Sequence, residues 1–208
     1  MEILLNQIGK RFNFNWIFKG ISYTIASGDK IVILGSNGSG KSTFLKLISG
    51  ATLPSEGSIQ WKLDGIPIEA ERIYNRISIS APYLELIEEF TLAEHIDFHF
   101  SIKSPVGKLS RSEILALTGL KNSADRRISY FSSGMIQRVK LSLAILTDTP
   151  LLLLDEPLSN LDAQATSWYQ SLIREYAGLK TVIVCSNSQK SEYEFCQKNL
   201  DIQSYRSL

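Results

Sequence analysis

A glycine-rich loop that ends in a lysine and two hydroxyl residues carries the clearest chemistry in the sequence. It reads GSNGSGKST and matches the spacing G-x-x-x-x-G-K-[ST]. Glycines let the backbone curl so that successive N–H groups converge on phosphate oxygens at the positive end of the following helix. The lysine adds a compact positive charge, and the first hydroxyl is a ligand for Mg²⁺. The loop therefore predicts a site for a nucleoside triphosphate, taken as ATP, with magnesium. The predicted binding residues are Gly35, Ser36, Asn37, Gly38, Ser39, Gly40, Lys41, Ser42 and Thr43.

Two adjacent acids at the end of an apolar run form the second candidate cluster. The run is LLLLDEP, and its acids are Asp155 and Glu156. Asp155 is suited to hold magnesium together with Ser42, whereas Glu156 is suited to accept a proton from an attacking water. With the charge of Lys41, the two clusters together predict phosphoryl transfer.

The elements around these clusters predict a layered α/β fold with a parallel sheet. KIVIL at 30–34, LLLLD at 151–155 and TVIVC at 181–185 are short apolar runs typical of buried parallel strands. STFLKLISG, after the phosphate loop, suits a buried helix that Gly50 ends. Between 54 and 82, turn signals alternate with strand-like pieces such as SIQW and RISIS, which predict an antiparallel excursion.

The segment from Pro82 to about Gly134 has a helical pattern. It opens with Thr91 and Glu94, three residues apart, which predict a capping box at a helix start. His95 and His99 follow at a spacing at which two imidazoles could share a metal. Ile96 occupies the position where the zinc-protease pattern needs glutamate, so we interpret both histidines as part of a helix face.

Length and composition exclude several classes. The chain has 208 residues, 44% of them hydrophobic and 21% charged, and a net charge of +1, which predicts one globular domain and gives no support to a nucleic-acid partner. The first residues do not form a secretory signal, and the apolar runs fall far short of the roughly 20 residues of a membrane-spanning helix. We therefore expect a cytosolic protein whose membrane association requires a partner. Cys185 and Cys196 are interpreted as inert buried thiols.

With the further segments YFSSGMIQRVKLSLAIL and LSNLD on either side of LLLLDEP, the sequence resembles the ATP-binding cassette (ABC) family over nearly its whole length. The resemblance implies a P-loop NTPase, RecA-like core with an N-terminal antiparallel β subdomain and a helical subdomain at about 84–140. The whole chain, 1–208, would then be a single ATP-binding domain.

The resemblance also implies that two chains build each ATP site. The family motif Leu-Ser-Gly-Gly-Gln corresponds here to FSSGM, with Ser132, Ser133 and Gly134. In the family these residues contact the γ-phosphate of ATP held by another subunit, so the function implied is that of a homodimer or of a heterodimer with another ABC subunit. Asp162, in SNLD, resembles the family residue that links the two sites across the dimer interface.

The resemblance also implies that an aromatic residue near the N-terminus contacts the adenine base. The family stacks the base on such a side chain, and Phe12 in GKRF is the best match. Phe14 and Trp16 are alternatives, and each of the three could equally be a core aromatic.

Two positions depart from the family pattern. Tyr83 follows RISISAP where the family has a glutamine that touches magnesium, and Asn187 follows TVIVCS where it has a histidine against the γ-phosphate. Asn187, which we include among the catalytic residues, can donate a hydrogen bond but cannot become cationic. Since Glu156 is retained, the hypothesis is slow hydrolysis, with ATP binding and dimer closure better preserved than turnover.

The function implied is that of the ATPase subunit of a transporter with a separate membrane permease, located in the cytoplasm at the inner face of the cell membrane. Within transporters, the short length resembles compact export-type subunits, including those of haem-exporter type. The alternative is a soluble cassette of the repair, chromosome or translation type. Cassettes of the repair and chromosome types contain a long inserted coiled coil, for which this sequence has no sustained heptads. Translation-type proteins carry two cassettes in tandem, and this chain has one. A P-loop kinase would not explain FSSG or SNLD.

Overall fold

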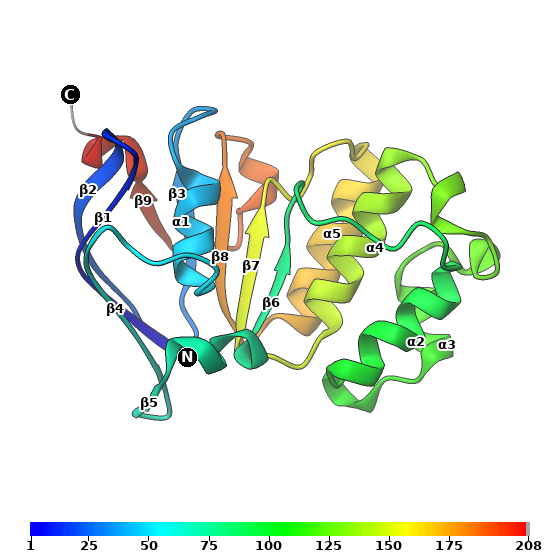
Figure 1. Ribbon diagram of the computed structural model, residues 1–208. Coiled ribbons are helices and arrows are strands. Elements are labelled where there is room, and N and C mark those ends of the chain that lie inside the picture. The colour runs from blue at the N-terminus through cyan, green and yellow to red at the C-terminus, as the bar shows by residue number, and fades with distance from the viewer. Residues whose placement is uncertain (207–208) are drawn as a thin grey trace.

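The computed structural model describes residues 1–206, which form two sheets with helices packed between and beside them (Figure 1). Within these residues, one sheet has the strand order β6-β7-β8-β3-β9 and the other β2-β1-β4-β5. Neighbouring strands are parallel in the first sheet and antiparallel in the second. The predicted fold class is confirmed, including the antiparallel sheet formed mainly by the N-terminal strands.

The parallel sheet consists of short strands, which are mostly buried except for the edge strand β9. They are β3 (Lys30–Leu34), β6 (Ile77–Ser80), β7 (Leu151–Asp155), β8 (Thr181–Ser186) and β9 (Lys198–Asp201). Three of them lie where the apolar runs predicted strands. The prediction for RISIS was wrong, because β6 is not part of an antiparallel excursion but pairs in parallel with β7. Its residues are mostly buried, as in a strand covered on both faces, which suits the parallel sheet.

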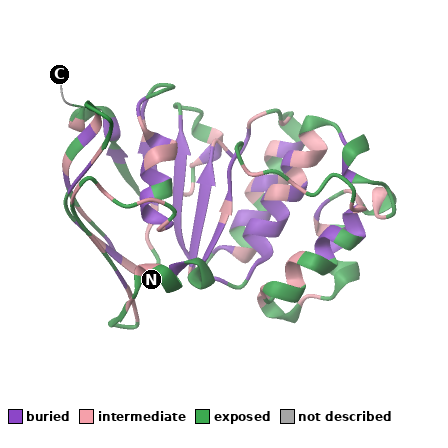
Figure 2. Ribbon diagram, in the orientation of Figure 1, coloured by how far each residue is buried: buried purple, intermediate pink, exposed green. Residues whose placement is uncertain are grey.

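Side chains of the parallel strands alternate between two separate hydrophobic clusters, because successive residues of a strand point to opposite faces. One cluster lies against α1 (Lys41–Ile48) and the antiparallel sheet, and the other against α4 (Ser133–Leu146) and α5 (Ala163–Tyr176). The first takes Ile31, Ile33, Leu151, Leu153, Ile183 and Cys185, and the second takes Val32, Leu152, Leu154, Val182 and Val184. Figure 2 shows the two central strands β7 and β8 as buried along their whole length.

The antiparallel sheet covers the outer side of α1. Its strands are β1 (Glu2–Phe12), β2 (Asn15–Ile25), β4 (Glu56–Leu63) and β5 (Ile66–Ile68). The indole N–H of Trp61 on β4 donates to the carbonyl of Ile48 at 2.9 Å, and so ties this sheet to the last turn of the helix. Helix α1 therefore lies between the two sheets (Figure 1).

Two further helices, α2 (Leu92–Ile102) and α3 (Arg111–Leu117), lie beyond α4 on the side away from the antiparallel sheet (Figure 1). The predicted capping box at Thr91 and Glu94 is confirmed, and a second one is formed by Ser110 and Glu113. Short 3₁₀ turns complete the described chain at Ala70–Arg76, Val106–Lys108, Lys121–Ser123, Ile128–Tyr130, Lys190–Glu192 and Ile202–Tyr205. Across residues 1–206, the helices are too short or too polar to span a bilayer.

Candidate functional site

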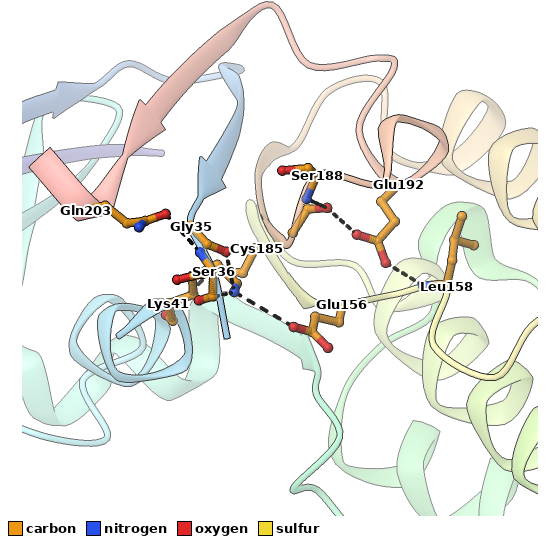
Figure 3. Close-up of polar contacts among 10 residues, drawn as sticks. Gly35, Ser36, Lys41, Glu156, Leu158, Cys185, Ser188, Glu192 and Gln203 are labelled. Carbon is orange, nitrogen blue, oxygen red and sulfur yellow. Dashed lines mark hydrogen bonds and ion pairs between the residues drawn. The ribbon is translucent and has the colours of Figure 1, made fainter. Parts of the chain in front are cut away.

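The phosphate loop connects β3 directly to α1, which is the strand–loop–helix context that the motif requires. Gly40 has φ +102°, and a side chain there would also collide with Ile17 of β2, so this position needs glycine. The Lys41 side chain is buried, and its ammonium donates to the carbonyls of Gly35 at 2.8 Å and Ser36 at 3.2 Å (Figure 3). The lysine thus points back into the loop that it follows.

The two acids of LLLLDEP emerge beside this loop. Asp155, the last residue of β7, is 3% exposed, and Glu156 Oε1 lies 3.8 Å from Lys41 Nζ. Burial raises the pKa of the Asp155 carboxyl, while a hydrogen bond from the Ser42 hydroxyl lowers it. A hollow of about 280 Å³ opens beside Glu156, and its lining also includes Ile17 and loop residues 37–38 and 40–43. The structure therefore brings together the two clusters that the sequence singled out.

Asn187 and Tyr83 are the two positions that depart from the family pattern. Asn187 follows the last residue of β8, next to β7 in the sheet, and is exposed. Burial, with the neighbouring Asp155 charge, raises the pKa of the Tyr83 phenol to about 12, so that it stays neutral. Lys46 Nζ lies 4.5 Å from the centre of the Tyr83 ring. The position that departs from the family glutamine is thus filled by a phenol held against α1 by a cation–π contact.

The residues of FSSG lie elsewhere, around a second hollow. Ser132 caps α4, its hydroxyl accepting from the Met135 N–H at 3.3 Å. Gly134 packs against the loop that follows β7, since a side chain on it would come within 3.1 Å of the Asn160 carbonyl. Ser132, Gly134, Asn160 and Asp162 all line a hollow of about 270 Å³ that shares no residue with the one at the phosphate loop. Ser133, the first residue of α4, is exposed beside it. Within one chain, the signature residues and the phosphate loop are not brought together.

The three aromatic candidates for the adenine contact differ in where they point. Trp16 is engaged by the cations of Arg11 and Lys19, at 5.5 Å and 4.8 Å from its ring. Phe14, in the turn between β1 and β2, is 92% exposed. Phe12 is the last residue of β1, 53% exposed, with Lys10 Nζ 5.3 Å from its ring. Since Arg11 lies against Trp16 and strand neighbours point to opposite faces, Phe12 points to the face opposite Trp16.

Each histidine of α2 uses its Nε2 in a contact outside the phosphate loop. Nε2 of His95 accepts from the Ile87 N–H at 3.1 Å, and Nε2 of His99 lies 2.8 Å from the Thr147 hydroxyl. Cys185 is buried as expected, but Cys196 is only partly so. Burial raises the pKa of both thiols, that of Cys196 to about 12, which keeps them protonated.

Sequence reasoning missed two residues that hold the outside of the phosphate loop. The Ser36 N–H donates to Gln203 Oε1 at 3.0 Å (Figure 3), and the Arg206 guanidinium donates to the Gly38 carbonyl at 2.9 Å. The two residues of each pair are separated by more than 160 positions along the chain, so no local sequence pattern predicts the contact. Both contacts restrain the backbone of the phosphate loop from its outer side.

Gln203→Ala is expected to weaken ATP binding by about two- to fivefold, because one solvent-accessible hydrogen bond to the loop is lost. The measurement is the Kd for ATP by calorimetry. Gln197→Ala, a change of the same kind at an exposed position, serves as the matched control. An equal loss in both variants would show that the Gln203 contact does not support the loop.

Comparison of the chain with known proteins identifies its family. The model of the ABC transporter family matches residues 18–159. The chain is 28% identical over 205 residues to Nod factor export ATP-binding protein I of Burkholderia lata, covering 97% of this chain and 67% of that protein. It is 34% identical over 179 residues to the Fe(3+) ions import ATP-binding protein FbpC of Escherichia coli O157:H7, covering 82% of this chain and 50% of that protein.

Among solved structures, the fold is similar to the dimeric structure of MJ0796, a bacterial ABC transporter cassette. The TM-score is 0.80 at 24% identity, over 97% of this chain and 95% of that one. The family match covers the phosphate loop, the signature residues and the acids of β7, which the structure arranges as two hollows on one domain. The chain therefore belongs to the ABC transporter family of ATPases.

Proposed function

We propose that this chain binds ATP with magnesium, hydrolyses it with Glu156, and energises a separate membrane permease through ATP-driven pairing of two cassettes. The observation that carries the proposal is the 3.8 Å separation between Lys41 Nζ and Glu156 Oε1 across the hollow at the phosphate loop. It sets a phosphate-binding cation beside a candidate base, and both line the hollow together with the residues of the loop.

In this proposal the loop residues 35–43 receive the phosphates. Lys41 exchanges its contacts with the Gly35 and Ser36 carbonyls for phosphate oxygens. Glu156, at the mouth of the hollow, orients the attacking water and accepts its proton. Phe12 stacks on the adenine, since it lies on the face of the hairpin opposite Trp16, whose ring is already covered by two cations.

Ser42 and Asp155 fit a magnesium ion. Both offer oxygen, the ligand that Mg²⁺ prefers, and the Ser42 hydroxyl lies close enough to the Asp155 carboxyl to lower its pKa. Asp155 is a buried carboxyl, and burial raises its pKa because it disfavours the charged form. When bound there, magnesium would reduce the negative charge of the phosphates that has to be overcome in transfer.

The two separate hollows support a two-chain site. The signature residues Ser132, Ser133 and Gly134 lie apart from the phosphate loop of their own chain, as required if they serve the ATP of a facing cassette. The same hollow is lined by Asp162, which would then link the two sites. The partner is a second copy or another ABC subunit, and the similar cassette MJ0796 is described as dimeric.

Both curated relatives named above are ATP-binding proteins of an export or an import system, which favours transport over the soluble repair, chromosome or translation types. The chain would then act in the cytoplasm, bound to the inner face of the membrane through its permease and not through a span of its own. No nucleic acid is needed as a partner.

The test is purification of the tagged full chain from cells in mild detergent, followed by assay of the complex. The expected result is a stable complex with an integral membrane protein, and ATP turnover that rises when the two are reconstituted together. Recovery with ribosomes or DNA and without a membrane protein would contradict the transport role.

Turnover is expected to be slow, because Asn187 cannot supply a cation next to the γ-phosphate. Asn187→His is predicted to raise kcat by about 10- to 100-fold, by analogy with the gain of one charge-stabilising donor. The measurement is phosphate release at saturating ATP, with Asn199→His, also exposed, as the matched control. Unchanged turnover in Asn187→His would remove this residue from the list of groups that limit hydrolysis.

A further inference from the structure

A buried carboxylate lies between the carboxyl ends of β7 and β8. It belongs to Glu192, in the 3₁₀ turn Lys190–Glu192, and the residue is only 2% exposed. Among residues 1–206, Glu192 forms no ion pair with a basic side chain. Burial raises its pKa, and the charges of Glu156 and Asp155 raise it further. Burying a carboxyl group lowers the stability of the fold unless its oxygens accept hydrogen bonds.

Both of its oxygens accept hydrogen bonds, one from the loop after β7 and one from the last residue of β8 (Figure 3). Oε1 accepts from the Leu158 N–H at 3.2 Å, on the loop that leaves β7. Oε2 accepts from the Ser186 hydroxyl, at the end of β8. The same Ser186 oxygen accepts from the Ser188 N–H at 3.3 Å. One carboxylate therefore joins the loop after β7 to the carboxyl end of β8.

The bridged positions flank the two residues to which hydrolysis is assigned. Leu158 comes two residues after Glu156, while Ser186 and Ser188 enclose Asn187. Glu156 has φ +46°, a conformation that side-chain-bearing residues rarely adopt, so its direction depends on what holds the chain after it.

Other contacts hold the same loop. The Glu156 N–H donates to the Cys185 carbonyl at 2.9 Å, and the Gln137 amide donates to the Pro157 carbonyl at 2.8 Å. Glu192 differs from both in that its side chain contacts the loop after β7 at Leu158 and also Ser186, whose hydroxyl accepts from the Ser188 N–H on the far side of Asn187.

We propose that Glu192 is a positioning residue for ATP hydrolysis, whose carboxylate sets the distance and direction between the Glu156 loop and the Asn187 loop. The proposal rests on the roles assigned to Glu156 and Asn187 under the proposed function. It deepens that function by naming the group that holds the hydrolytic half of the site together. Glu192 does not contact the phosphate loop through its carboxylate, so ATP binding should not depend on it.

The central test is a comparison of kcat with ATP affinity in Glu192 variants of the full chain. Glu192→Ala is expected to lower kcat by about 10- to 100-fold, because misplacing a catalytic group by an ångström has an effect of this order. The Kd for ATP should stay within about twofold of the wild-type value. Glu192→Gln keeps an acceptor for Leu158 and a donor for Ser186, and should recover most of kcat.

Tyr169→Phe is the matched control for general loosening of the same turn. The buried Tyr169 hydroxyl donates to the backbone carbonyl of Glu192 at 2.9 Å, so the variant removes a neighbouring hydrogen bond and leaves the carboxylate bridge in place. It is expected to lower the melting temperature while leaving kcat within about twofold. Ser186→Ala removes one arm of the bridge, and should lower kcat without adding to the loss in the double variant with Glu192→Ala.

Three results would overturn the proposal. They are a Glu192→Ala protein with wild-type kcat, an equal fall of kcat in Tyr169→Phe, and additive losses for Glu192→Ala and Ser186→Ala. If Glu192→Ala does not fold, Ser186→Ala against Tyr169→Phe decides the question. Glu156→Gln is assayed in parallel: if that variant hydrolyses ATP normally, the assignment of Glu156 fails, whatever the Glu192 variants do.

Discussion

Glu156→Gln is expected to bind ATP as the wild-type chain does and to lose at least about 100- to 10,000-fold in hydrolysis, the contribution of a positioned general base. Glutamine keeps the size and the polar contacts of the side chain but cannot accept the proton of water. Since Lys41 faces Glu156 across the hollow, the variant also removes one acid from the place where the phosphates would lie. ATP affinity is therefore expected to stay equal or to increase.

The measurements are phosphate release at saturating ATP and the Kd for ATP with magnesium. ATP should also hold the variant in its paired form, which light scattering or gel filtration would detect as a doubled mass. Glu71→Gln, an equal change at an exposed position, is the control. Hydrolysis at the wild-type rate in Glu156→Gln would mean that another group activates the water.

Lys41→Met is the second change with a large expected effect, and it acts on binding. Methionine retains an unbranched apolar stem in a place that is 5% exposed, but it offers no hydrogen-bond donor and no charge. Hydrogen bonds to charged groups contribute about 1.5 to 3 kcal/mol, so ATP affinity should fall by about 10- to 100-fold. Hydrolysis falls with it at any ATP concentration below the new Kd.

The Kd is best measured by calorimetry, on protein whose fold has been checked by circular dichroism. Lys121→Met changes an exposed lysine and should bind ATP normally. Unchanged affinity in Lys41→Met would contradict the assignment of the phosphate loop itself, and with it the centre of the proposed function.

Sequence alone was sufficient for the parts of the site that are local. The phosphate loop and the β7 acids are contiguous motifs, and KIVIL, LLLLD and TVIVC are apolar enough to predict buried strands. The Thr91–Glu94 capping box is also local, because its two side chains are three residues apart. In each of these cases the physical cause and its signal lie within one short segment.

The parts that could not be predicted depend on contacts between distant segments. The direction of β6 was wrong because it is set by its pairing with β7, far along the chain. Gln203 meets Ser36 across 167 residues, and Glu192 meets Leu158 across 34. Each is a single polar residue in an ordinary stretch, and becomes significant only through the carbonyl or N–H that the fold brings to it.

If two cassettes share each ATP as proposed, the division of the core by the parallel sheet has a consequence for a pair of unlike chains. The phosphate loop begins the helix packed in one cluster, while the signature residues begin the helix packed in the other. A substitution that loosens the α1 side would weaken the hold of a chain on its own ATP. A substitution that loosens the α4 side would leave that hold intact and impair the site on the facing chain. In a pair of unlike subunits, the damaged chain and the damaged site would then be on opposite sides of the interface.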